Sequence, residues 1–148
     1  MIDFVGMYNN ACAFYDCAEI CRQKAESGQS YECLSLNTPA IVNCAFACEM
    51  FLKLLIKANT GDYKKIHDLD KLFKLLPQDI QERLNKEVYY KTGMIRDAFG
   101  IPMIKKVAKH FNEWRYSFEK SNLMGYTGYL FGLCAVLKEE ASQLRVKQ

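Results

Sequence analysis

Residues 38–59 read TPAIVNCAFACEMFLKLLIKAN, and Ala40 to Ile56 is the most apolar run in the chain. A proline near a helix start loses no hydrogen bond, and the Thr38 hydroxyl before Pro39 can accept an unpaired amide. We therefore predict a helix over most of this stretch, ended by Gly61. The apolar run is too short to span a bilayer, which needs about 20 apolar residues. It is typical of a central core helix, and no membrane association is predicted.

Apolar residues recur at intervals of three and four on both sides of this stretch, which is the helical period. No segment shows the strict alternation of a half-buried strand. The predicted fold is an all-α, single-domain bundle of five to six helices spanning residues 1–148. In addition to the helix within residues 38–59, helices are predicted over residues 3–27, 69–76, 77–92, 102–118 and 123–145. Residues 29–37 are predicted to be a loop.

The composition excludes several classes of protein. The 148 residues are 50% hydrophobic and 25% charged, with 3 prolines and 8 glycines, so the chain can bury a core. Disordered and collagen-like chains are excluded. The 20 lysines and arginines against 17 acidic residues give a net charge of only +3. Any nucleic-acid site must therefore be local rather than a basic surface that wraps a duplex.

The N-terminus and the cysteines predict a reducing compartment. Asp3 stands where a signal peptide needs basic residues, so a cytoplasmic location is expected. Seven cysteines are an odd number, which favours free thiols over disulfides. Two pairs at helical spacing, Cys17 with Cys21 and Cys44 with Cys48, can hold zinc or a cluster if their helices abut. Buried structural thiols are the favoured interpretation, and no metal or cofactor is predicted.

Arg115 is the residue with the clearest chemical interest. Continuing the apolar stripe from Ile104 to Phe111 places it on or beside the buried face of its predicted helix. One interpretation is a structural ion pair with a carboxylate such as Glu49 or Glu119, because an unpaired buried charge is costly. The other is that its planar guanidinium faces a phosphate in a cleft.

Two segments carry a family resemblance. The first runs from Pro39 to Leu76, with Glu49 and Lys53 on the apolar helix and His67-Asp68-Leu69 after it. The second is Phe111-Asn112-Glu113-Trp114-Arg115-Tyr116-Ser117-Phe118-Glu119. In this order and spacing they resemble the HEPN (higher eukaryotes and prokaryotes nucleotide-binding) superfamily, over roughly residues 38–140. The second segment is similar to the one that carries the family's signature arginine.

The resemblance implies a dimeric helical bundle, and many such proteins are metal-independent ribonucleases of toxin–antitoxin or antiphage systems. Their motif is an arginine followed after four to six residues by a histidine, which moves a proton while the arginine stabilises the charged phosphorane. In this chain the corresponding positions are Lys120, Ser121 and Asn122. Because none is a histidine, we expect cleavage to be slow or absent. His110 precedes Arg115 and does not fit the motif.

The resemblance and the residue types together define a candidate cleft around Arg115, built between two protomers, that binds or processes RNA or a nucleotide. Arg115 is the catalytic candidate. The binding candidates, chosen for charge, stacking or hydrogen bonding, are Arg115, Trp114, Tyr116, Lys105, Lys106, Lys109, Lys120 and Asn122. The candidates for cleft support are Glu49, Lys53, Glu119 and His67. The alternative is a catalytically inactive interaction module that binds a protein partner, such as a nucleotidyltransferase-type antitoxin.

Two further patterns leave alternatives open. Glu49 and Lys53 are four residues apart on the apolar helix, which is typical of a solvated edge. The resemblance implies instead that Glu49 faces the cleft and can pair with Arg115. Gly125, Gly128 and Gly132 form a strip of small residues on the last predicted helix. Such a strip allows close packing, either inside the bundle or at a dimer contact.

Overall fold

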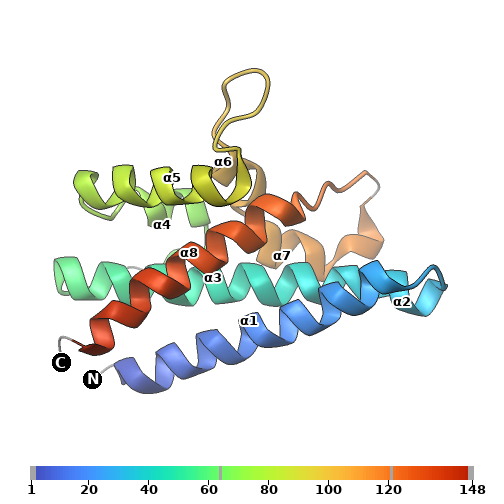
Figure 1. Ribbon diagram of the computed structural model, residues 1–148, viewed down its shortest axis with the longest axis horizontal. Helices are drawn as coiled ribbons and strands as arrows, with labels where there is room; N and C mark the ends of the chain where they lie inside the picture. Colours follow the sequence, from blue (N-terminus) through green and yellow to red (C-terminus); the bar gives the residue numbers. More distant parts are fainter. Residues whose placement is uncertain (1–2, 64, 121, 147–148) are drawn as a thin grey trace.

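The computed structural model describes residues 3–63, 65–120 and 122–146, and every named element in these ranges is a helix (Figure 1). The four long helices are α1 (Phe4–Ser27), α3 (Asn37–Thr60), α5 (Gln78–Thr92) and α8 (Thr127–Val146). The short elements are α2 (Tyr31–Ser35), α4 (Leu69–Phe73), α6 (Met103–Val107), α7 (His110–Arg115) and the 3-10 turn η1 (Ser117–Glu119). The predicted all-α fold class is confirmed.

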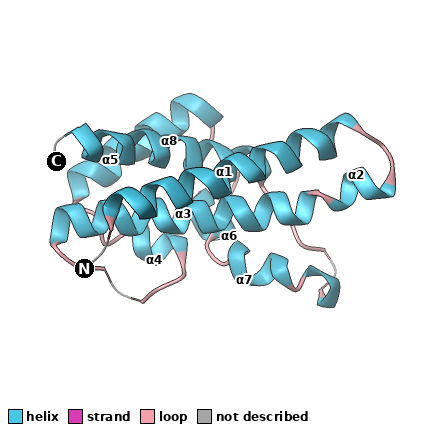
Figure 2. Ribbon diagram, turned by 90° about the horizontal axis from the view of Figure 1, so that it is seen from below, coloured by secondary structure: helices cyan, strands magenta, loops and turns pink. Residues whose placement is uncertain are grey.

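Helix α3 lies at the centre of the bundle. It contacts α1, α8, α7 and α4, and Figure 2 shows α1 running alongside it. By length and composition alone the segment Tyr31–Thr60 is apolar enough to cross a membrane, but 78% of the apolar window is buried inside the bundle. Its apolar character is what a helix covered on several sides requires. The predicted central core helix is confirmed.

Several predicted helix ends are confirmed because the residues there have the right backbone chemistry. Gly61 and Gly93 follow α3 and α5 in the left-handed conformation, with φ of 86° and 73°. Side-chain-bearing residues rarely adopt this conformation. Asp68 caps α4 by accepting a hydrogen bond from the Lys71 amide.

The segment predicted as the loop 29–37 differs from expectation. It contains α2, whose first turn is capped by the Ser30 hydroxyl through the Cys33 amide. Helix α3 begins at Asn37, directly after Leu36, and has no side-chain cap. The predicted capping role of Thr38 is therefore wrong: Thr38 lies inside the first turn.

The helix predicted over residues 102–118 is divided into α6, α7 and η1. The break lies at Ala108 and Lys109, because the Ala108 carbonyl accepts a hydrogen bond from the Leu69 amide at 3.0 Å. That carbonyl points to α4 instead of continuing a helical ladder. The division changes the predicted buried stripe: Ile104 is buried as expected, whereas Phe118 is 81% exposed.

The last helix begins at Thr127 rather than at Leu123, because Tyr126 has a positive φ of 49° that ends any helical run before it. Gly125 therefore lies outside α8, and the three glycines do not form one helical strip. A Cβ on Gly125 would lie 2.8 Å from Ile41, and one on Gly132 would overlap Thr92. These two glycines serve packing inside the bundle, while Gly128 faces open space.

Candidate functional site

Arg115 ends α7, and a series of aromatic rings holds this short helix on the bundle. Phe111 stacks on Phe46 of α3 with ring centroids 4.9 Å apart, and Phe46 meets Phe14 of α1 edge to face at 4.8 Å. The Arg115 guanidinium lies over the Phe111 ring at 4.5 Å. The ring series therefore fixes the position of the cation relative to the core.

The Arg115 side chain is exposed, which corrects the predicted placement on or beside the buried face. The physical reason is the break before α7, which rotates this residue away from the stripe of α6. Its guanidinium donates a hydrogen bond of 2.8 Å to Asn112 Oδ1 and lies 5.5 Å from the Tyr116 ring. Within the described ranges no carboxylate forms an ion pair with it, so the predicted pairing with Glu49 or Glu119 is wrong.

The residues after Arg115 present aromatic surface to solvent. Tyr116 is 50% exposed and Phe118 is 81% exposed, and their rings meet edge to face at 6.4 Å. We call Arg115, Tyr116 and Phe118 the Arg115 surface. Lys120 and Asn122 follow it and are also exposed.

Two residues near this surface point inward instead. Trp114 packs against the core, and its buried indole N–H has no hydrogen-bond partner among the described residues. It is less available for stacking than Tyr116.

His110 is 4% exposed and lies 2.9 Å from the Gly125 carbonyl, to which its Nε2–H donates. Burial lowers the pKa of His110 below its ordinary value, so this histidine is a neutral structural group. Ser121 lies outside the described residues.

The predicted lysine group lines a cavity of about 390 Å³ beside α4, α6 and α7. The lining residues are Asp68, Asp70, Lys105, Lys106, Ala108, Lys109 and Glu113. Three carboxylates thus share the cavity with the three lysines, and Lys106 also pairs with Asp97 at 3.2 Å. Arg115 does not line it. The structure brings the three lysines, which were binding candidates for their charge, together but places acidic groups among them, so they do not form a purely basic surface.

Glu49 and Lys53 of α3, together with His67 from the segment before α4, form a separate cluster, which we call the Glu49 cluster. Glu49 is 3% exposed and Lys53 is 9% exposed, so the interpretation as a solvated edge is wrong. Glu49 Oε1 lies 2.7 Å from Lys53 Nζ and 2.9 Å from His67 Nδ1. Its second oxygen, Oε2, is buried without a partner in the described chain. The burial follows from the central position of α3, which leaves this helix without a solvated side here.

The Glu49 cluster has a defined chemical capability. An ionised carboxylate only accepts hydrogen bonds, so Nδ1 of His67 is the donor and Nε2 of the neutral ring is left as an acceptor. The His67 side chain is 59% exposed. Its ring is therefore open to solvent, but Arg115 has no part in this cluster.

The cysteines form a group that the spacing did not predict. The sulfurs of Cys44 and Cys48 on α3 and of Cys134 on α8 all lie within 4.8 Å of one another, and all three residues are buried. Cys17 is exposed and instead accepts a hydrogen bond from the Asn43 amide. The predicted four-thiol alternative is therefore wrong. Cys134 is 90 residues beyond Cys44 and 86 beyond Cys48, so no short sequence spacing links it to them.

The pKa values of these three thiols shift in opposite directions, although burial alone raises all of them. Burial raises the pKa values of Cys44 and Cys134 well above their ordinary range. Burial also raises the pKa of Cys48, but hydrogen bonds from the thiols of Cys134 and Cys44 outweigh it and lower that pKa to about 6. The first proton lost from the cluster therefore leaves Cys48.

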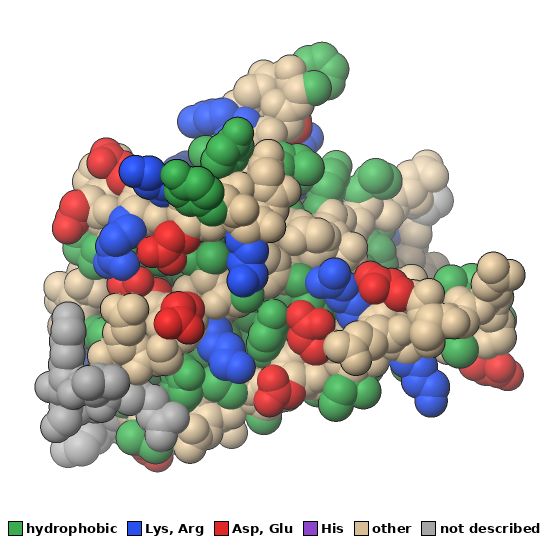
Figure 3. Space-filling view, viewed as in Figure 1, with side chains coloured by type: hydrophobic (Ala, Val, Ile, Leu, Met, Phe, Trp, Pro, Cys, Tyr) green, Lys and Arg blue, Asp and Glu red, His purple; other side chains and the backbone are tan. Residues whose placement is uncertain are grey.

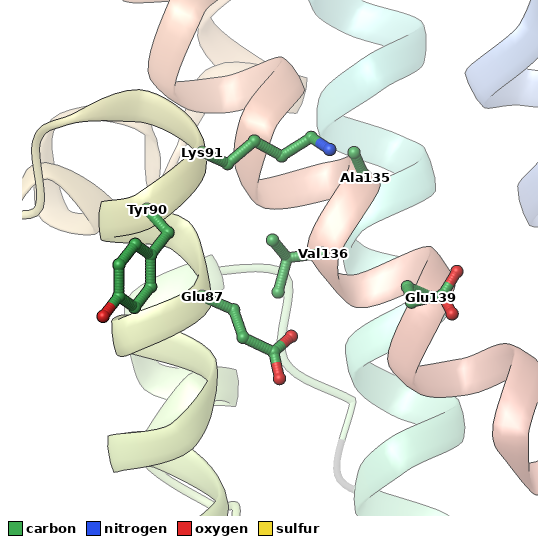
Figure 4. A pocket seen from close by; sticks show the side chains of 6 residues that line it. All are labelled: Glu87, Tyr90, Lys91, Ala135, Val136 and Glu139. Carbon is green, nitrogen blue, oxygen red and sulfur yellow. The ribbon is translucent and has the colours of Figure 1, made fainter.

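A groove of about 510 Å³ lies between α5 and α8, outside the predicted site, and Figure 4 shows the side chains that line it. Its lining residues are Glu87, Tyr90, Lys91, Ala135, Val136 and Glu139. The Lys91 amine extends toward α8, while Glu139 points away from the gap (Figure 4). Its charged groups do not converge on one point, so this groove has no evident catalytic arrangement.

A projecting loop between α5 and α6 was also missed. Asp97 Oδ1 accepts hydrogen bonds from the amides of Phe99 and Ile101, both at 2.9 Å, and fixes the turn. Phe99 is 89% exposed. Figure 3 shows hydrophobic side chains at the tip of this projection. An ordered loop that exposes an aromatic ring is typical of a protein contact.

Comparison with known proteins assigns the chain to a family. The family model of the HEPN domain matches residues 18–144. No match was found among curated proteins or among solved structures. The matched range contains α3, α7 and most of α8, and it covers most of the chain. The chain therefore belongs to the HEPN domain family.

Proposed function

We propose that this protein binds single-stranded RNA at the Arg115 surface and acts as a cytoplasmic dimer in a toxin–antitoxin or antiphage setting. Membership of the HEPN family indicates a helical protein with a role related to nucleotides or RNA. One observation carries the assignment of the surface: the exposed Arg115 guanidinium is held in place without a carboxylate partner within the described residues.

The guanidinium is suited to a phosphate because it is both ordered and available. It has five N–H donors, and the hydrogen bond to Asn112 uses one of them. The Phe111 ring beneath it restricts its rotamers before a ligand arrives. Binding therefore loses less side-chain entropy than binding by a free surface lysine. A phosphate can take two of the remaining donors in the bidentate geometry that arginine favours.

The exposed rings favour RNA over a free nucleotide. The Tyr116 ring lies 5.5 Å from the cation and meets the Phe118 ring, and both rings are exposed to solvent, where a base can stack. Two stacking groups next to one phosphate site match consecutive nucleotides of a single strand. Lys120 and Asn122 lie beyond them and extend the polar path.

Dimerisation is supported by the family, whose members commonly dimerise, and by the loop that exposes Phe99. A second copy of this chain is an available partner for the exposed loop, because it is present wherever the protein is made. Two protomers would bring two Arg115 surfaces into one cleft, as the family resemblance implies. The dimer is thus part of the same proposal.

Cleavage of the bound RNA is expected to be slow or absent. The described residues at the motif spacing, Lys120 and Asn122, are poor general bases at neutral pH. His67 belongs to the Glu49 cluster rather than to the Arg115 surface. The expected primary activity is therefore binding.

The test is fluorescence anisotropy with a labelled single-stranded RNA of mixed sequence at low salt. Arg115→Ala should weaken binding about tenfold or more, because a charge-assisted hydrogen bond contributes about 1.5 to 3 kcal/mol. Lys86→Ala is the matched control, since it removes one exposed positive charge from α5. Equal losses in both variants would show that only net charge matters.

The interaction-module alternative has its own supporting observation. Phe118 and Phe99 are far more exposed than core aromatic residues, as expected where a protein partner docks. If the wild-type protein binds neither RNA nor ATP at low salt, the alternative is preferred. If ATP binds and RNA does not, the ligand is a nucleotide.

A further inference from the structure

Three cysteine thiols meet in the core of the bundle, away from the Arg115 surface. Cys44 and Cys48 are one helical turn apart on α3, and Cys134 approaches them from α8. Their sulfurs lie within 4.8 Å of one another. Cys44 and Cys48 also share one acceptor, the Leu130 carbonyl, at 3.7 and 3.9 Å. The side chains are therefore oriented toward a common point before any ligand binds.

The spacing is close to that of three sulfurs around one ion. An ion about 2.3 Å from each of three sulfurs, in one plane with them, separates the sulfurs by about 4.0 Å. A pyramidal arrangement brings them closer. Each sulfur needs to move by less than about 1 Å to reach this geometry, which side-chain rotation can provide while both helices stay in place.

Charge decides which ion the site can hold. All three cysteines are fully buried, with exposed fractions of 0%, and an uncompensated charge in such a place is costly. The carboxylate of Glu19 acts on Cys44 from outside the cluster. A negative neighbour disfavours any complex that is itself negative.

Common thiolate-bound metals do not satisfy this condition. Three thiolates leave a Zn²⁺ complex with a charge of −1 and one ligand short of the tetrahedral four that structural zinc requires. With Cu⁺ the charge is −2. A trivalent ion with three thiolates is neutral, and trivalent arsenic takes three sulfur ligands in a pyramid with no fourth ligand.

We propose that Cys44, Cys48 and Cys134 form a binding site for trivalent arsenic. In the binding reaction As(OH)₃ exchanges its three hydroxyl groups for three cysteine sulfurs. Each thiol proton leaves with one hydroxyl group as water, so three As–S bonds replace three As–O bonds. Arsenic stays trivalent and the sulfurs stay reduced, so no oxidant or reductant takes part.

The test is to incubate the reduced full-length protein with arsenite, in a phosphine reductant rather than a competing dithiol. Native mass spectrometry after desalting should show one arsenic per chain and the loss of three hydrogens. The melting temperature should rise by about 5 to 10 °C at an arsenite concentration a hundredfold above Kd. The rise is the critical sign, because arsenic captured by the unfolded chain lowers the melting temperature.

Cys134→Ala should abolish both the retained arsenic and the rise in melting temperature. Cys48→Ala is the second cluster variant, in case the first folds poorly. The matched control is Cys17→Ala, which removes an exposed thiol of α1 and should behave as wild type. The proposal is overturned if arsenite lowers the melting temperature of the wild-type protein. It is equally overturned if the cluster variants keep the full effect or if Cys17→Ala loses it.

Discussion

Replacing Glu49 by glutamine removes the charge of the one carboxylate in the Glu49 cluster while keeping its shape. Lys53 would then carry a positive charge in a position where its side chain is only 11% exposed. The 2.7 Å contact between Lys53 Nζ and Glu49 Oε1 would lose its ionic component. We expect the free energy of unfolding to fall, because a buried charge without its partner is strongly unfavourable.

The magnitude follows from the surroundings of Lys53. Breaking a buried pair by removing one partner costs about 3 to 5 kcal/mol. Two features reduce this: the Tyr63 ring, 5.4 Å from Nζ, still attracts the cation, and glutamine still offers an acceptor oxygen. We therefore expect a loss of about 2 to 3 kcal/mol. For a chain of this size that is a drop of about 4 to 12 °C in melting temperature.

The assay is chemical denaturation followed by circular dichroism, with a double-mutant cycle. Lys53→Met removes the charge on the other side and keeps the apolar stem. The double variant Glu49→Gln/Lys53→Met should recover part of the loss, because no buried charge then remains unpaired. Arg115→Ala is the contrasting variant, and its exposed position predicts a change within about 0.5 kcal/mol.

The reasoning is refuted if Glu49→Gln unfolds within about 0.5 kcal/mol of wild type, which is the range for surface substitutions. It is also refuted if the two single losses simply add in the double variant. Either result would mean that Lys53 reaches water and that the pair behaves as a surface ion pair.

Three other predictions follow from the structure. Gly132→Ala should lower the free energy of unfolding by about 1 to 2 kcal/mol, because the added Cβ would meet Thr92. Gly128→Ala places its Cβ in open space and should raise the free energy of unfolding by up to about 1 kcal/mol in the same denaturation assay. Because the pKa of His110 is lowered in the folded chain, the unfolded chain takes up a proton first as pH falls, and stability should decline as pH falls through 6.5. His110→Gln should weaken that decline in melting curves. Analytical ultracentrifugation should find a dimer that Phe99→Ser weakens; a wild-type mass near 17.1 kDa at every concentration would contradict this.

The helices themselves were predictable because their signals are local. Gly61 and Asp68 act through their own backbone and side-chain chemistry, which a sequence displays directly. The break at Ala108 was not predictable in this way, since it depends on a hydrogen bond from Leu69 on another element. That single break decided where Arg115 points.

The composition of the sites was harder to predict than the helices. A glutamate and a lysine four residues apart are typical of a solvated face, and nothing in the pattern shows that α3 is covered at Glu49 and Lys53. Only the packing of several helices around α3 buries them. The cysteine cluster likewise needs α8 to lie against α3, which brings Cys134 to its two partners. Both features belong to tertiary structure.

The central claim, that the Arg115 guanidinium meets a phosphate of RNA, can be observed directly by NMR. The protein has five arginines, so the Nε–H signals in a side-chain spectrum can be assigned from single arginine-to-lysine variants. Titration with single-stranded RNA should shift the Arg115 signal more than those of Arg22 and Arg83, which are already paired with carboxylates. An Arg115 signal that stays unmoved while RNA binds would contradict the account.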